Sequence, residues 1–600
     1  IRDNVCIPLV GSTAPTRATA LVSEEVPAEI LDGKILFNTA ARHASRQDGV
    51  GLAVAVPPFN DAEAPQNLRV PGSVVSVSHD ASSVACTSCH ADFGGQDGRT
   101  WDFAQFGASL RNTMDLRGRA AFAPGTCSTP PYAACTFDAA CGDGAVCRMR
   151  EDLVPGHLPA GERDRYFNPM LTVHWNGDRD EVEDFEHTYR SLMGGGDCDG
   201  LEDAPTRCFG ALVQRSPVTS SDPVDVHPDL GAPNRNLAGV LDPATNAGVR
   251  LSHLADFVYS LTELVENPNP DSEAAKRGRA IFNDPQTRCG ECHDSRPVAG
   301  RQFFTDKRTR RRGENFNPAL PPGVESNNPF IRHDVGTTNV FDETDPNAVA
   351  TATGSFQNAA VPIPASRGVL DEYVTPVMND VWNTRPYLHD GSAHFLLDVV
   401  RPCDSAADDC FQVGRGRNLD DRHGITSILT PRQLNDLTAF QRTLGLDTPV
   451  GGGERIVRAG SLALARARVV FGKRRATFRV KGIVGNAPGP IDPAAGVELT
   501  LATPAGEEMT IVSRRVTMRP RGRGFTGRSR ESGLTVALAL RRLPAGRYRF
   551  KARGAGAALA ALDTGNRDLT VALEIGGVSY VKNRNLVGSR RLFRTARRRS

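Results

Sequence analysis

Two pentapeptides carry the residues best suited to chemistry, Cys86-Thr-Ser-Cys-His90 and Cys289-Gly-Glu-Cys-His293. Two thiols separated by two residues and followed at once by an imidazole form the C-x-x-C-H signature of covalent c-type haem attachment. The thiols add across the haem vinyl groups, and the imidazole then binds the iron from the proximal side. A redox-active dithiol needs no histidine after it, and a zinc site needs four ligands. The sequence therefore predicts two covalently bound c-type haems, held by Cys86, Cys89, His90, Cys289, Cys292 and His293.

The segments around these motifs repeat one plan. Asp32-Gly-Lys-Ile-Leu-Phe37 precedes the first motif and Arg277-Gly-Arg-Ala-Ile-Phe282 the second, and each ends an amphipathic helix; the second helix opens at Ser272. Downstream, a His-containing turn precedes further helices, predicted at 180–193 and 395–400. A closing helix then carries Leu254 and Phe257 in the first copy. In the second copy it begins with a Thr430–Gln433 capping box.

These patterns predict the fold class and the domains. We expect mainly α, cytochrome-c-like tandem domains with long disulfide-bearing loops, followed by a C-terminal all-β sandwich. The N-terminal cytochrome domain covers residues 28–268 and includes a Cys-rich insert, and the C-terminal cytochrome domain covers 269–447. Residues 1–27 are expected to be a linker or the remnant of an upstream domain, because the chain starts with Ile1 and reads as a processed product.

The remaining cysteines suggest disulfides. Four crowd one Gly/Pro/Ala-rich loop, at positions 127, 135, 141 and 147, and two further pairs flank polar loops, Cys198 with Cys208 and Cys403 with Cys410. Free core cysteines or metal ligands are the less favoured alternatives, and Cys6 is left without a partner. Disulfides persist in oxidising compartments, and covalent haem is attached outside the bacterial cytoplasmic membrane. We therefore expect a periplasmic, extracellular or cell-surface protein.

Charge divides the 600-residue chain. Residues 451–600 hold 31 Lys and Arg against 9 Asp and Glu, a balance of +22, so the first 450 residues carry −20 and the whole chain only +2. All Cys and His precede residue 451. The basic segment alternates apolar and polar residues between Gly/Pro turns, as in 476–480, 534–540 and 569–573, which indicates strands of a β-sandwich at 454–600.

The basic domain is expected to meet an anionic surface or an acidic protein, the chain's own acidic half included. A solvated basic surface is the alternative. Nucleic acid is not expected, because aromatic residues are few there and no binding motif occurs. No stretch approaches the roughly 18 apolar residues of a transmembrane helix, so no membrane span is predicted.

The segment Thr375-Pro-Val-Met-Asn-Asp-Val-Trp-Asn-Thr-Arg-Pro-Tyr-Leu-His-Asp-Gly-Ser392 resembles the "T-P-x-L-R-x-V…A-P-Y-x-H-D-G-S" stretch of the di-haem cytochrome c peroxidase superfamily, which includes methylamine-utilisation maturation peroxidases. In the first copy, Leu110-Arg-Asn-Thr-Met114 and His174-Trp-Asn-Gly-Asp178 are similar to a branch fused to an N-terminal β-propeller. The resemblance covers the two predicted haem domains, and it implies that a propeller preceded Ile1.

The resemblance also implies roles for the site residues. His174 and His389 are expected to be catalytic, donating hydrogen bonds to haem propionates or to a bound oxygen species. The family places the sixth ligand of the C-terminal haem fourteen residues after the His of H-D-G, as Met or Tyr, but here that residue is Cys403, which a disulfide to Cys410 would consume. The metal ligands predicted besides His90 and His293 are Met193 and His423.

Other sixth-ligand candidates stay open. They are Met378 and His389 for the second haem, and Met114, His174 and Tyr189 for the first. A Met in a helical stripe is more often core than ligand. The loop at 176–180 is a candidate for the Ca²⁺ that the family often binds between its haems.

Three functions remain open at this stage. The first is a di-haem electron-transfer cytochrome that reduces hydrogen peroxide with electrons from a small redox donor protein or the quinol pool, with the His293 haem as relay and the His90 haem as reaction centre. The second is an extracytoplasmic electron conduit without catalysis. The third is a surface-binding scaffold with structural haems.

Overall fold

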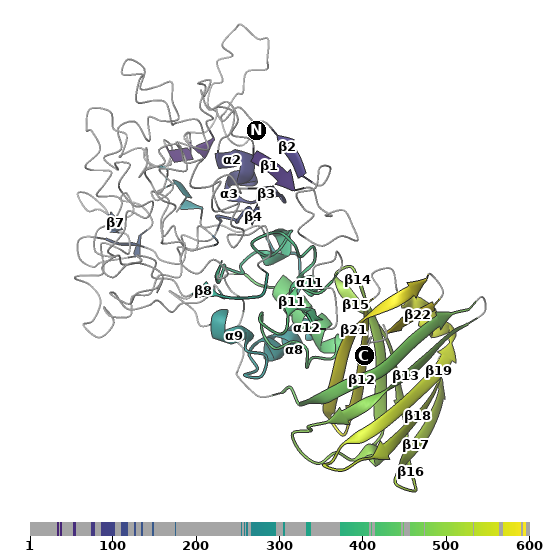
Figure 1. Ribbon diagram of the computed structural model, residues 1–600. Coiled ribbons are helices and arrows are strands. Elements are labelled where there is room, and N and C mark those ends of the chain that lie inside the picture. The colour runs from purple at the N-terminus through teal and green to yellow at the C-terminus, as the bar shows by residue number, and fades with distance from the viewer. Residues whose placement is uncertain are drawn as a thin grey trace, which may run out of the picture.

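The computed structural model describes two kinds of region (Figure 1). One is a set of short segments around the two CxxCH motifs, and the other is a nearly continuous C-terminal sheet. The described residues are 33–34, 37–38, 52–55, 74–77, 86–102, 110–117, 125–127, 134–135, 147–148, 175, 254, 257–258, 260–261, 266–295, 304–305, 332–337, 373–406, 410, 415–445, 448, 456–472, 475–531, 533–562, 568–589 and 592–595.

The expectation of a mainly α protein is wrong. Of the described residues, 21% lie in helices and 40% in strands. Each CxxCH motif forms a helix of only four residues. The helices are α2 (Cys86–Cys89), α3 (Ala91–Gly94), α8 (Glu273–Phe282), α9 (Cys289–Cys292), α11 (Leu396–Val400) and α12 (Pro431–Arg442), with 3₁₀ turns η10 (Val381–Asn383), η11 (Pro493–Ala495) and η12 (Ala557–Ala561).

The helices that do form begin where the sequence predicts. Ser272 caps α8, its side chain accepting a hydrogen bond from the Ala275 N–H. Thr430 and Gln433 form the predicted capping box of α12. These two helices pack against each other, and the close approach requires Gly278, because a Cβ there would lie 1.9 Å from the Asp436 carbonyl oxygen. Local capping chemistry thus fixes both helices, and a glycine lets them meet.

The first copy also contributes strands that the sequence analysis did not predict. A four-stranded sheet lies beside the first CxxCH motif in the order β2-β1-β3-β4. Its strands are β1 (Leu52–Ala55), β2 (Val74–Val77), β3 (Thr100–Asp102) and β4 (Leu110–Asn112). The smaller pairings of this half involve β5 (Gly125–Cys127), β6 (Ala134–Cys135), β7 (Cys147–Arg148), β8 (Arg332–His333), β9 (Tyr373–Val374), β10 (Pro402–Cys403) and β11 (Asn418–Leu419).

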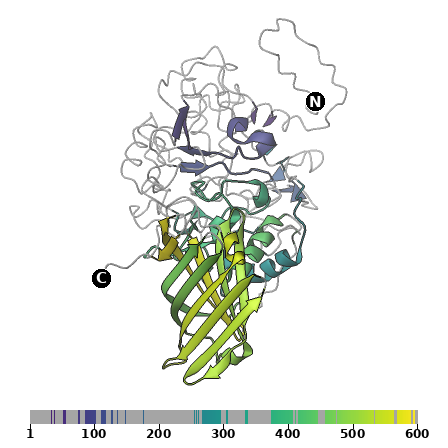
Figure 2. The same ribbon diagram turned by 90° about the vertical axis from the view of Figure 1, so that its right-hand side faces the viewer.

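The C-terminal segment forms one continuous sheet, so the expected sandwich of two separate sheets is wrong. Hydrogen bonds run through 11 strands in the order β15-β14-β20-β21-β22-β12-β13-β19-β18-β17-β16, and the sheet curls because β21 also pairs with β12 (Figure 2). The strands are β12 (Ala459–Phe471), β13 (Ala476–Gly485), β14 (Val497–Ala505), β15 (Glu508–Val516), β16 (Arg519–Arg521), β17 (Gly524–Glu531), β18 (Leu534–Arg542), β19 (Tyr548–Gly556), β20 (Asp568–Ile575), β21 (Val578–Ser589) and β22 (Leu592–Thr595).

Period-two patterning explains how this sheet buries its core. In β18, Leu534, Val536, Leu538 and Leu540 face inward and are at most 5% exposed, while the residues between them face outward. The inner faces of β12–β15 and β18–β21 enclose one hydrophobic cluster that includes Phe478, Phe550 and Tyr580. The sheet therefore curls around its own core, which explains why it needs no covering layer of helices.

A second core holds the region that we call the C-terminal CxxCH lobe, built from α8, α9, α11 and α12. Its buried side chains include Phe282, Phe304 and Phe440. Asn435 on α12 joins this lobe to the sheet, since its side chain exchanges two hydrogen bonds with the Met509 backbone on β15, at 2.7 and 3.1 Å.

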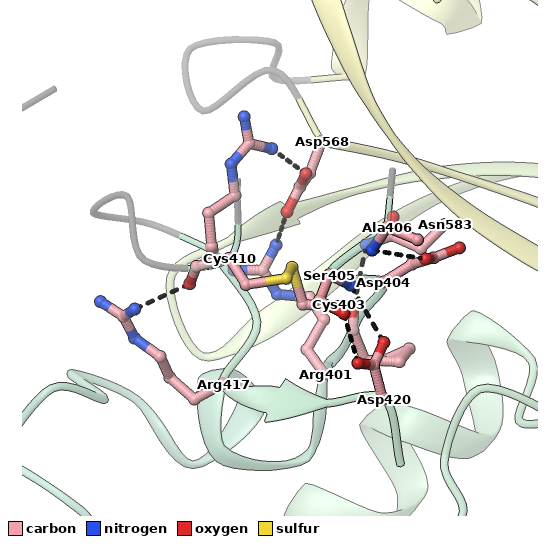
Figure 3. Close-up of a disulfide and its surroundings, with 12 residues drawn as sticks. Arg401, Cys403, Asp404, Ser405, Ala406, Cys410, Arg417, Asp420, Asp568 and Asn583 are labelled. Atoms are coloured by element: carbon pink, nitrogen blue, oxygen red, sulfur yellow. Dashed lines mark hydrogen bonds and ion pairs between the residues drawn. A yellow bond between two sulfur atoms is a disulfide. The ribbon is translucent and has the colours of Figure 1, made fainter. Parts of the chain in front are cut away.

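The predicted disulfide between Cys403 and Cys410 is formed, and it lies at this junction (Figure 3). Asp404, inside the loop that the disulfide closes, accepts hydrogen bonds from Lys582 and Arg584 of β21 at 2.8 and 3.1 Å. Arg401 and Arg415 both pair with Asp568 of β20. Among the described residues, no helix combines the length and the hydropathy that a bilayer crossing requires.

Candidate haem site

The second CxxCH motif is presented by a turn between α8 and α9. Arg288 adopts a left-handed conformation (φ 63°) that reverses the chain after α8, and α9 then places Cys289, Cys292 and His293 on one turn. The Nδ1–H of His293 donates to the Phe304 carbonyl oxygen at 2.8 Å. A donor at Nδ1 fixes the tautomer and leaves the Nε2 lone pair available for a metal. This is the arrangement that a proximal haem ligand requires.

The two motifs share their local geometry, as the repeated sequence plan predicts. The histidine backbone angles are φ −92° and ψ 65° at His90, and φ −93° and ψ 68° at His293. Phe37 lies 6.5 Å from the His90 ring at 46°, and Phe282 lies 6.3 Å from the His293 ring at 49°.

Each of these phenylalanines also contacts a phenylalanine of the helix that closes its copy. The distances are 5.2 Å and 59° for Phe37 with Phe257, and 5.4 Å and 62° for Phe282 with Phe440. The two segments therefore build the same aromatic support twice, although more than 160 residues separate Phe257 from Phe440 in the sequence.

The four CxxCH thiols are free, in contrast to the disulfide-bonded Cys403 and Cys410. Burial raises the pKa of Cys86 to about 12 and that of Cys289 to about 11, and it raises the pKa of Cys89 further. A redox-active dithiol needs a lowered thiol pKa, so these surroundings disfavour that alternative. Among the described residues, no group of three or more His, Cys, Asp or Glu side chains is placed to hold a metal ion directly.

A cavity of about 320 Å³ opens beside the second motif, within the range typical of cofactor sites. Cys289, Cys292 and His293 line it on one side. Its other walls come from both copies, with Met114, Arg117 and Trp175 from the first copy and with Met378, His389 and His423 from the second. The residues present fit a covalently attached haem, because two thiols, a proximal imidazole that donates from Nδ1 and a mostly apolar space adjoin one another.

A braced loop presents His423 to this cavity. Its backbone N–H donates to Asn418 Oδ1 at 2.9 Å, and the Asn418 amide donates back to the Gly424 carbonyl at 2.7 Å. Gly424 (φ +81°) permits a close approach to the motif, because a Cβ there would lie 3.1 Å from the Thr287 carbonyl oxygen. The loop is therefore built to hold His423 against the CxxCH turn.

The imidazole rings of His423 and His293 lie close together, with their centroids 6.1 Å apart and their planes at 47°. Nδ1 of His423 is shielded from solvent and has no hydrogen-bond partner among the described residues. Burial, with charge repulsion from His293 and His333, lowers the pKa of His423 to about 3, so the ring is neutral at neutral pH. A neutral imidazole is the form that binds a metal.

His389 lies in the cavity wall and is 2% exposed. Its ring stacks on Tyr373 at 3.8 Å, and its Nδ1 lies 3.1 Å from the Thr337 hydroxyl. Met378, also predicted as a ligand candidate, is buried in the same wall. Cys403 is bonded to Cys410, so it is not available as a thiolate ligand.

The two copies contact each other directly beside the cavity. The Asn112 N–H donates to the His389 carbonyl at 2.6 Å, and the Trp175 indole donates to the Asn112 carbonyl at 2.8 Å. Arg117 pairs with Asp115 in its own copy at 2.5 Å and with Asp380 of the second copy at 3.3 Å. Residues of the first copy are thus fixed at the wall of the second copy's cavity.

Sequence reasoning missed His333, Tyr373 and the Phe304 carbonyl. His333 Nδ1 lies 3.7 Å from Cys292 Sγ, on the cavity wall. His333 does not lie in a recognisable motif. The one sequence signal that pointed to it was that every histidine of the chain precedes residue 451. Several predicted residues lie outside the described part: His174, Met193, Tyr189, the loop at 176–180, Cys6, Cys141, Cys198 and Cys208. Cys127, Cys135 and Cys147 lie in strands whose side chains are not described.

Comparison with known proteins relates part of this chain to other proteins. No family model matches the chain. The chain is 28% identical to hydrazine synthase subunit gamma of Kuenenia stuttgartiensis over 221 residues, which are 33% of this chain and 49% of that protein. It thus spans about half of the relative that it matches.

Among solved structures, a MauG-like protein associated with microbial copper homeostasis is matched over 33% of this chain and 57% of that one. The identity is 18% and the TM-score is 0.20, which is too low to assign a shared fold. The sequence match to the hydrazine synthase subunit is therefore the comparison that bears on the chain's relationships.

Proposed function

We propose that this chain is a di-haem c-type cytochrome that transfers electrons. The observation that carries the proposal is the matched geometry of the two motifs, with the same backbone at His90 and His293 and the same phenylalanine support behind each. Two equivalent proximal sites are what two equivalent cofactors need. When bound, the iron of each haem supplies one-electron redox chemistry.

The chain's own residues would then prepare each site. The Phe304 carbonyl holds the proton of His293 at Nδ1, so Nε2 is the nitrogen through which His293 would hold the cofactor. His423 is the second residue that would hold the iron at this site, since its ring lies 6.1 Å from that of His293 in the wall of the same cavity.

Partial similarity to a subunit of hydrazine synthase supports a redox role. The disulfide at Cys403 and Cys410 supports a place outside the cytoplasm, in the periplasm or at the cell surface. A small redox protein or the quinol pool is the donor that we propose.

Reduction of hydrogen peroxide is the second candidate activity. It takes up two electrons and two protons and gives two molecules of water, so two one-electron centres in one chain match its demand. The contact between the copies at Asn112, Trp175 and His389 favours it, because it brings both halves of the chain to one cavity. An electron conduit without catalysis is the alternative.

A pyridine haemochrome assay on the purified chain tests the cytochrome proposal, with two haems per chain expected. The double variants Cys86→Ser/Cys89→Ser and Cys289→Ser/Cys292→Ser should each retain one haem. The variant Cys403→Ser/Cys410→Ser is the matched control and should retain both. A ratio other than two in the unmodified chain would refute the proposal.

Peroxide turnover is tested separately on the fully reduced holoprotein, in which each of the two haems can supply one electron. One equivalent of peroxide should oxidise two haems per molecule. If the haems stay reduced in excess peroxide, the peroxidase activity is refuted. The electron conduit without catalysis is then the function that remains.

A further inference from the structure

The outer side of the curled sheet is covered by cations. In β13 and β19, Phe478, Val480, Phe550 and Ala552 point into the core, and the alternate positions hold Arg and Lys. We call the outward set the basic face. It consists of Arg466, Arg468, Arg479, Lys481, Arg519, Arg521, Arg528, Arg530, Arg541, Arg549, Lys551 and Arg553, all exposed except the half-buried Arg468.

Strand register places these cations side by side. Arg468 lies opposite Arg479, which lies opposite Arg553, and in the next row Lys481 lies opposite Lys551. Neighbouring strands are about 4.8 Å apart, and like charges that face each other across strands destabilise a sheet. The cations on neighbouring strands therefore repel one another, and this repulsion destabilises the sheet when it is alone.

No carboxylate relieves this repulsion within the central strands. The sequences of β12, β13, β18 and β19 contain no Asp or Glu. Glu531, the acidic residue at the end of β17, pairs with Arg514 on β15. Within the described part of the chain, no ion pair is formed by any member of the basic face.

The basic face points away from the CxxCH lobe. The lobe contacts the sheet through β15, β20 and β21, by way of Asn435, Arg401 and Asp404. The basic face lies on β12, β13 and β16–β19, and Figure 1 shows β13 and β16–β19 on the part of the sheet away from the lobe. A partner bound there would leave the cavity accessible.

We propose that the basic face binds the surface of an anionic lipid bilayer. The cations spread in two dimensions over a convex sheet, which matches a layer of charged headgroups better than a linear polymer that follows one row. Between them lie small residues, Thr477, Thr535, Ala537, Ala539 and Ala555. A specific protein interface has aromatic anchors at its centre and few lysines, and this face has no aromatic side chain on its outer side.

Vesicle flotation with the full chain tests this proposal. The chain should float with vesicles of 30% phosphatidylglycerol in phosphatidylcholine and not with pure phosphatidylcholine. Each cation near an anionic bilayer multiplies the binding constant roughly fivefold, so the variant Arg479→Gln/Lys551→Gln/Arg553→Gln should bind about 100-fold more weakly. Binding should also fall as NaCl is raised, because salt screens the charges.

The matched control is Arg432→Gln/Arg458→Gln/Arg515→Gln, which removes the same charge at exposed positions outside the basic face. The fold-decrease in its binding constant should be less than about a fifth of that measured for the first variant. Equal losses in the two variants would show binding by net charge alone and would overturn the proposal. Failure to float with anionic vesicles, including the case in which the chain instead binds a soluble acidic polysaccharide or an acidic protein, would overturn it too. Thermal unfolding of both variants shows whether the sheet is intact.

Discussion

Arg401 of the CxxCH lobe forms an ion pair with Asp568 of the curled sheet, and neither side chain is more than 3% exposed. Arg415, also buried, binds the other oxygen of the same carboxylate, and Asp398 accepts from Arg401 at 2.9 Å. Two guanidinium groups and two carboxylates therefore balance each other inside the junction. A buried charge that loses its partner destabilises a fold. The stability of the junction therefore depends on the presence of each of these four charged side chains.

Replacing Asp568 by Asn should lower the free energy of unfolding by about 3–5 kcal/mol, because Arg401 and Arg415 would remain buried with an uncompensated charge. Urea denaturation measures this change. Asp404→Asn is the control, since Asp404 also binds two cations but is 30% exposed, and it should cost about 0–1 kcal/mol. Similar losses in both variants would contradict the role given to burial.

Replacing His423 by Ala should convert one of the two haems from low-spin to high-spin, because the ligand opposite His293 is removed. Low-temperature EPR and the Soret band of the oxidised protein report the change. His333→Ala is the control, since it removes an imidazole from the same cavity wall, one whose Nδ1 lies 3.7 Å from the Cys292 sulfur. An unchanged low-spin spectrum in His423→Ala would assign the ligand to another residue, with Met378 the next to test.

The Cys403→Ser/Cys410→Ser variant should lose about 2 kcal/mol of stability, as expected for opening a loop with a sequence separation of 7. Its haem spectrum should be that of the unmodified protein, because neither sulfur is available to iron. Differential scanning calorimetry and absorption spectroscopy check the two statements. A shifted Soret band would show that this region contacts the cofactor after all.

Asp380 should make stability depend on pH. Burial, with repulsion from Asp115, raises the pKa of its carboxyl from 3.8 to about 7. A raised carboxyl pKa means that the folded state keeps a proton that the unfolded state loses, so this contribution is complete below about pH 4 and is lost as pH rises to 7. The slope cannot exceed about 1.4 kcal/mol per pH unit for one proton.

In Asp380→Asn this part of the pH dependence should disappear, measured by urea denaturation between pH 4 and 8. Asn suits the position because Asp380 has φ 61°, a conformation that Asn tolerates. Asp271→Asn, at a more exposed ion pair, is the control and should retain the slope. An identical slope in Asp380→Asn would refute the assignment.

Local sequence signals predicted the parts of the fold that local interactions decide. The CxxCH spacing, the Ser272 and Thr430 caps and the short loop between Cys403 and Cys410 each involve residues fewer than ten positions apart. Contacts across long separations were not predictable from one sequence. Examples are the stacking of Tyr373 on His389 and the carbonyl of Phe304 that binds His293.

The curled sheet shows the same division. Alternation in β13 and β18 predicts which side chains face the core, but not which strands are neighbours. The pairing of β12 with β21 brings Gly460 beside Tyr580, 120 residues away, and this contact joins what alternation alone suggested were two sheets. The expectation of a mainly α chain failed because most of the described strand residues belong to the curled sheet, while each CxxCH motif forms a helix of only four residues.

The twin support behind His90 and His293 has one further consequence. Matched backbone angles and phenylalanine packing would hold the two proximal imidazoles alike, and at His293 the Nδ1–H also donates to the Phe304 carbonyl. A hydrogen bond at Nδ1 raises the basicity of an imidazole ligand. The direction of internal electron flow would therefore depend on this carbonyl as well as on loops such as the one that carries His423.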